Sequence, residues 1–75
     1  MPLYYFDIRS GDGHVLDEEG THLPDMKSAE IEATNSLADV MRDAASGGRI
    51  QPVAVEALDQ ERRMFFRASV DFRKL

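Results

Sequence analysis

The stretch Asp25–Ser46, DMKSAEIEATNSLADVMRDAAS, decides the fold because it carries the period of a helix. Its apolar residues recur at steps of three and four and form one stripe: Met26, Ala29, Ala33, Leu37, Val40 and Ala44. Asp25 is a good N-cap because its carboxylate can accept hydrogen bonds from the first free N–H groups. Gly47 or Gly48 can supply the C-cap. We therefore predict one helix over residues 25–46.

The segments on either side of this helix, residues 1–24 and 49–75, each have room for one hairpin. Apolar and polar residues alternate in both segments, as they do in half-buried strands. Ser10–Gly13 contains two glycines and reads as a tight turn, and Asp59–Arg62 reads as a longer one. The predicted strands are Leu3–Arg9, His14–Asp17, Val53–Leu58 and Met64–Phe72. The last strand alternates most cleanly, and we expect it to be long and central in the sheet.

The order hairpin, helix, hairpin predicts a two-layer α+β fold, ββαββ, within a single domain, 1–75. A four-stranded antiparallel sheet would pack one face against the apolar stripe of the helix. The expected core follows from the strand alternation and the helix stripe: Tyr4, Phe6, Ile8, Val15, Leu23, Ala33, Leu37, Val40, Val53, Val55, Phe66, Val70 and Phe72.

Composition bounds what such a chain can do. With 43% hydrophobic residues the sequence is too apolar for a disordered tail, and its net charge of −5 opposes binding to a phosphate backbone. It has no Cys, no signal peptide and no apolar run long enough for a membrane span, which fits a cytoplasmic protein. A domain of this size is marginally stable, and association with a second copy would bury more apolar area. We therefore expect a homodimer.

Three short motifs occur in a fixed order along the chain. They are Met1-Pro2-x-Tyr4-x-Phe6-Asp7, then Asp17-Glu18-Glu19-Gly20, then Leu23-Pro24-Asp25 leading into the Ala-rich helix. In this order, followed by a valine strand and a long last strand, the chain resembles a family of short bacterial proteins that carry a domain of unknown function. The resemblance covers essentially the whole chain. It supports the predicted layout and implies no catalytic activity and no ligand.

The residue pattern assigns no catalytic, cofactor-binding or metal-ligating residue. No serine lies in a nucleophile elbow, and Gly11-Asp12-Gly13 lacks the lysine and the helix of a phosphate loop. One acidic connector does combine oxygen and imidazole ligands: Asp12, His14, Asp17, Glu18, Glu19 and His22. Its spacing does not match a Ca²⁺ loop, because Val15 and Leu16 stand where ligands are needed. We read the connector as a solvated acidic segment and keep a metal-dependent activity there as a second alternative.

Two surfaces are candidates for partner contacts. The face of the sheet away from the helix is predicted to carry Leu3, Tyr5, Leu58 and Phe65, and the far side of the helix carries Ile31 and Ala38, with Ala45 one heptad further on. Arg9, Arg67 and Arg73 on the same sheet face suggest single-stranded nucleic-acid binding as an alternative. The absence of a catalytic constellation and the aromatic sheet face predict a non-enzymatic interaction or regulatory module that acts through protein–protein contacts as a homodimer.

Overall fold

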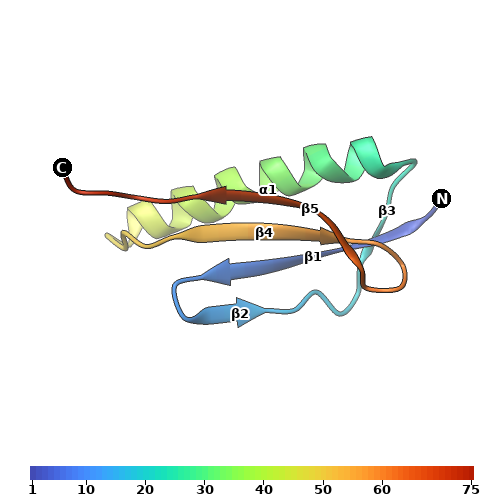
Figure 1. The fold of residues 1–75 in the computed structure, drawn as a ribbon, viewed down its shortest axis with the longest axis horizontal. Helices are drawn as coiled ribbons and strands as arrows, with labels where there is room; N and C mark the ends of the chain where they lie inside the picture. The colour runs from blue at the N-terminus through green and yellow to red at the C-terminus, as the bar shows by residue number, and fades with distance from the viewer.

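The helix α1 (Met26–Ser46) begins and ends where the sequence predicts, in a computed structural model that describes residues 1–75 (Figure 1). The Asp25 carboxylate accepts a hydrogen bond from the Ser28 backbone N–H at 2.8 Å. Hydrogen bonds from the Ser28 backbone and side chain hold the pKa of Asp25 below its usual value of 3.8. At the other end the Gly47 N–H bonds the Asp43 carbonyl and Gly48 adopts φ +73°, so the predicted glycines do end the helix.

The sheet contains five antiparallel strands, one more than predicted. Their bounds are β1 Leu3–Ser10, β2 Gly13–Val15, β3 Thr21–His22, β4 Val53–Leu58 and β5 Met64–Val70. The order across the sheet is β2-β1-β4-β5, and β3 pairs with β1 beyond the end of β2. Gly11 at φ +58° makes the β1–β2 turn. The extra strand β3 lies in the segment predicted as a connector, because two residues carry no period that a sequence could reveal.

The prediction that the last strand is central in the sheet is wrong. β5 is an edge strand, and the central positions belong to β1 and β4. All six residues of β4 are buried, whereas β5 alternates between exposed and half-buried residues. Clean alternation marks a strand with one solvated face, while a strand covered on both faces reads as a continuous buried run. The last strand also ends at Val70, two residues earlier than predicted.

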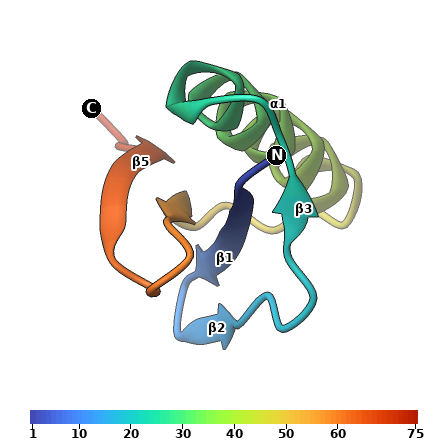
Figure 2. The same ribbon diagram turned by 90° about the vertical axis from the view of Figure 1, so that its right-hand side faces the viewer.

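The helix packs on one face of the sheet, chiefly against β4 and less against β5 (Figure 2). The centre of the core is formed by Ala33, Val55 and Ala57, and half-buried residues pack around it: Phe6, Ile8, Leu37, Phe65 and Phe66. Two residues predicted for the core, Val15 and Phe72, are instead 64% and 47% exposed. α1 does not combine the length and apolarity that a membrane-spanning helix needs.

Candidate functional site

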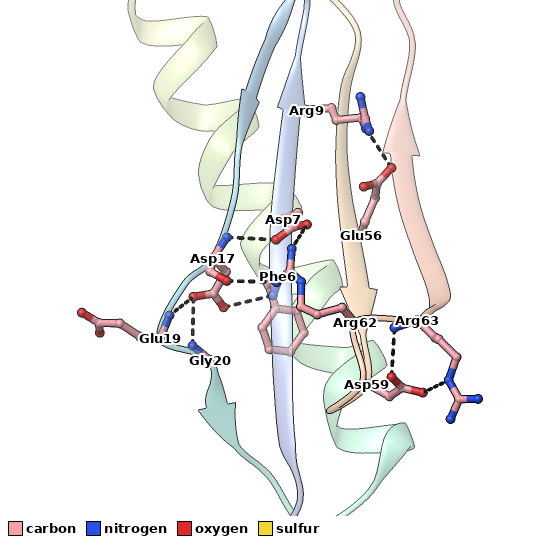
Figure 3. A network of polar contacts seen from close by, with 10 residues as sticks. All are labelled: Phe6, Asp7, Arg9, Asp17, Glu19, Gly20, Glu56, Asp59, Arg62 and Arg63. Carbon is pink, nitrogen blue, oxygen red and sulfur yellow. Dashed lines mark hydrogen bonds and ion pairs between the residues drawn. The ribbon is translucent and has the colours of Figure 1, made fainter.

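One edge of the sheet is capped by a loop. β2 and β3 both pair with the outer side of β1, and the segment between them, residues 16–20, leaves the middle of β1 without a strand on that side. The Asp17 carboxylate takes that place (Figure 3): its Oδ2 accepts from the Phe6 N–H at 3.0 Å. Its Oδ1 accepts from the Glu19 and Gly20 N–H groups at 3.2 and 3.0 Å. The Asp17 side chain therefore accepts from a backbone N–H of the edge strand and also stabilises the loop to which it belongs. We call this the capped edge.

Arg62, from the β4–β5 turn, ties the capped edge to the rest of the sheet. Its guanidinium donates to Asp7 Oδ2 at 2.8 Å and to the Asp17 carbonyl at 3.0 Å, and it lies 4.8 Å from the centre of the Tyr5 ring. Asp7, which also accepts from the Asp17 N–H, is only 3% exposed. A buried carboxylate needs such partners because desolvation of an unpaired charge is costly.

The β4–β5 turn holds Arg62 in an unusual backbone conformation, φ +65°, which L-residues rarely adopt. The Asp59 carboxylate stabilises this turn by accepting from the Glu61 and Arg63 N–H groups, both at 2.9 Å. The hydrogen bond from the Arg63 backbone is the main reason that the pKa of Asp59 lies below 3.8, and the Arg63 guanidinium, 3.2 Å from Asp59 Oδ2, adds to it.

A second ion pair lies on the face of the sheet away from the helix. Glu56, 8% exposed, stands directly opposite Asp7 and accepts from Arg9 Nε at 3.0 Å (Figure 3). Asp7, Glu56 and His14 bring three possible metal-ligand atoms within 4.8 Å of one another. Because Arg62 and Arg9 already balance both carboxylates, we assign these residues to structural ion pairing and no metal to the group.

The opposite edge, β5, is free. Seven consecutive residues, Met64–Val70, have β4 on one side and no strand on the other. No side chain or loop bonds the backbone of these residues, and no segment covers their outer edge in Figure 2. The strand contains no proline, and Arg67 is its one charged residue. Natural proteins usually protect such an edge with charges, proline, a bulge or a covering segment. Of these devices β5 has one charge, Arg67, and a register shift at Ala57/Leu58 near its start. We call this the free edge.

A hollow of about 270 Å³ lies on the surface between the helix and Phe66 of β5. It is lined by Lys27, Glu30, Ile31, Thr34, Asn35 and Phe66. Ile31 is 54% exposed although it is apolar and branched. Ala38 is exposed one heptad further along the helix. The helix therefore presents part of its predicted outer stripe on the same side as the free edge.

The other predicted interface residues are buried or half-buried by contacts within the chain. Leu58 is 8% exposed, and Phe65 packs against the core with its ring 5.7 Å from that of Tyr4. Tyr5 is half-buried beneath the Arg62 guanidinium, and Leu3 is half-buried against Gly20. Tyr5 and Leu58, which alternation assigned to the same sheet face, stand opposite each other on β1 and β4. Alternation does not reveal that the turn at Arg62 folds back over them.

The predicted arginines and the acidic connector are dispersed. Arg9 and Arg67 line one hollow of about 300 Å³, whereas Arg73 lies beyond the end of β5, 3.7 Å from Asp71. The connector residues do not converge on one point. Asp17 bonds backbone N–H groups, His22 Nδ1 contacts the Met1 carbonyl at 3.1 Å, and the remaining members, Asp12, His14, Glu18 and Glu19, are exposed.

Sequence reasoning missed the residues that distinguish the two edges. Asp7 and Arg62 are 55 positions apart, and no local pattern links them. Asp17 could have been suspected, because an Asp followed by Gly three residues later often accepts from the N–H groups of a turn. The free edge became visible only once the strand order was known, because β5 alternates like any half-buried strand.

Comparison with known proteins gives one match. The model of the family described as "Domain of unknown function (DUF6894)" matches residues 3–71, which include every strand and the helix. No curated protein and no solved structure matches the chain. The family match agrees with the resemblance carried by the three N-terminal motifs. The chain belongs to the family of the domain of unknown function DUF6894.

Proposed function

We propose that the protein is a non-enzymatic interaction module that acts through protein–protein contacts at its free edge, as a homodimer. The observation that carries this proposal is the contrast between the edges of a single sheet. The chain uses the Asp17 carboxylate and two short strands to occupy β1, and it leaves seven residues of β5 open. An open strand edge is a template for pairing with a strand of another chain.

The surroundings of β5 support this role. An added strand would lie beside the hollow that Ile31 and Phe66 line, and its side chains could cover both. The helix packs mainly over β4, so it leaves the edge of β5 accessible. A chain of 75 residues with a core centred on two alanines and one valine gains apolar burial from a second copy.

The oligomeric state tests this proposal. We expect light scattering across a concentration series to give twice the mass of the chain, and a monomer that persists at high micromolar concentration would overturn the proposal. Ala68→Lys places a charge within the free edge, a device that natural edge strands use against pairing. We expect it to yield a folded monomer by scattering and circular dichroism.

Ala38→Lys is the matched control, because Ala38 is exposed on the helix and lies outside the free edge. It should remain a dimer. If Ala38→Lys dissociates the protein and Ala68→Lys does not, the outer stripe of the helix is the interface instead. If the parent is a dimer and neither variant changes its mass, neither the free edge nor the outer stripe of the helix is the dimer interface.

Single-stranded nucleic acid is the alternative partner, favoured by Arg9 and Arg67 around one hollow. Against it, Arg9 is paired with Glu56 and Asp71 lines the same hollow. Oligonucleotide binding by the parent protein and by Arg67→Gln distinguishes the two functions. Loss of this charge should weaken oligonucleotide binding at low salt if the nucleic acid is the partner. If only the dimer forms, no salt-dependent oligonucleotide signal should appear.

A further inference from the structure

The free edge has a self-complementary sequence. Phe66-Arg67-Ala68-Ser69-Val70-Asp71-Phe72 is symmetric about Ser69 in its chemistry: phenylalanine stands at both ends, Arg67 mirrors Asp71, and Ala68 mirrors Val70. In an antiparallel pair related by a twofold axis through Ser69, each residue faces its mirror position in the other copy. A segment of this kind can pair with itself without placing like charges opposite each other.

We infer that two copies of the chain pair β5 with β5 in the register centred on Ser69, and that the strand extends to Phe72 when it does so. This inference rests on the proposed function and deepens it by naming the partner and its alignment. The four-strand paths of the two copies become one continuous sheet. Each copy contributes the same edge, so the interface closes on itself and does not propagate into a fibre.

The charges favour this register. Arg67 is exposed and makes no ion pair within the chain, although it stands opposite Glu56 in the β4–β5 register. The Asp71 carboxylate accepts from the Phe72 N–H at 3.0 Å and lies 3.7 Å from the exposed guanidinium of Arg73. In the dimer Arg67 faces Asp71 of the partner subunit, and symmetry repeats this pair. Oppositely charged residues that face each other across antiparallel strands are favourable, and like charges are unfavourable.

The apolar residues favour it as well. On the face nearer the helix, half-buried Ala68 and Val70 face each other, and Phe66 faces Phe72. Phe72 is 47% exposed in the single chain, so pairing gives it an aromatic neighbour and removes apolar surface from water. A register centred on Ala68 would place Arg67 opposite Ser69 and Phe72 opposite Met64, so it loses the directly facing charge pair and the aromatic pair.

A charge exchange between two variants tests the register. Arg67→Asp alone and Asp71→Arg alone each put like charges at both symmetric positions, and each should weaken the dimer about tenfold or more. An equimolar mixture restores both opposite-charge pairs in the heterodimer, so the mixture should associate as tightly as the parent protein. Analytical ultracentrifugation of each variant and of the mixture measures this. Arg42→Asp, on the exposed face of the helix, is the control and should not change association.

Ser69→Cys gives a second test that does not depend on charge. The chain has no other cysteine, and residues that face each other across antiparallel strands lie within disulfide range. Mild oxidation should link Ser69→Cys into a covalent dimer faster than Arg67→Cys, which faces position 71 and not itself. A dimeric parent with no rescue in the mixture and no preference for position 69 would overturn the register and leave the proposed dimer standing. A monomeric parent would overturn both.

Discussion

The two edges of this sheet are both formed by hairpins, but one edge is capped by a loop and the other is open. At the capped edge the Asp17 carboxylate bonds the Phe6 N–H, and Arg62 joins the loop to buried Asp7. At the free edge, Met64–Val70 has no partner beyond β4. A chain that blocks one edge with a dedicated side chain and leaves the other open controls where another strand can pair. We therefore place the proposed function at an edge of the sheet and not in a pocket.

The largest expected effect comes from removal of the Asp17 carboxylate. Asp17→Ala leaves the N–H groups of Phe6, Glu19 and Gly20 without acceptors, so we expect it to cost about 3 kcal/mol of unfolding free energy. It also uncovers the middle of β1, which should increase aggregation. Chemical denaturation measures the first effect and light scattering the second. Glu18→Ala, which removes a neighbouring exposed carboxylate that bonds no backbone group, is the control. Equal stability of the two variants would show that Asp17 does not cap the edge.

A smaller effect is expected at Arg62, which connects the β4–β5 turn to the capped edge. Arg62→Ala removes the cation beside Asp7 and should cost about 2 kcal/mol, between the values for exposed and buried ion pairs. Arg62→Gly should be about 1 kcal/mol more stable than Arg62→Ala, because glycine adopts φ +65° without strain. Arg63→Ala serves as the control at the same turn, and its exposed ion pairs should contribute little. Denaturant midpoints that rank alanine above glycine at position 62 would contradict the backbone argument.

The smallest effect concerns Asp59, whose carboxylate holds the turn that presents Arg62. Its pKa is lower in the folded protein than the usual 3.8, so its contribution to stability is complete above 3.8 and is lost as the pH falls through the folded value. Asp59→Asn cannot titrate. The difference in Tm between the parent and this variant should therefore be constant near neutral pH and should shrink below pH 3.8. Asp25 titrates in both proteins and cancels in the difference. A gap that widens in acid would contradict the assigned sign.

Local signals in the sequence were sufficient to locate the helix and four of the five strands, but not to show which strands pair with each other. Asp25 and Gly47-Gly48 bound the helix correctly, and alternation located four strands, with Val53–Leu58 found to the residue. The position of β5 at an edge depends on pairing between segments far apart in the chain, which periodicity does not encode. The same limit applies to the Asp7–Arg62 pair and to β3, which is defined only by its partner β1.

The candidate site illustrates a second limit. Ile31 was expected on an outer surface and is exposed there, whereas Leu58 and Phe65 were expected on an open face and are covered by their own chain. The β4–β5 turn folds back because Arg62 adopts a left-handed backbone conformation, and no periodic pattern in the sequence indicates this. By contrast, the symmetric pattern of Phe66–Phe72 is visible in the sequence, but the edge position of β5 is needed to relate it to pairing between copies.

Pairing of two copies through β5 is tested most directly by an isotope-filtered NOE experiment on a mixture of labelled and unlabelled chains, which reports only contacts between copies. Pairing of β5 with β5 about Ser69 predicts intermolecular contacts between the Ala68 methyl group and the Val70 methyl groups of the partner subunit, and between the rings of Phe66 and Phe72. Intermolecular contacts confined to Ile31 and Ala38 on the helix, or to β2 and β3 at the capped edge, would contradict it.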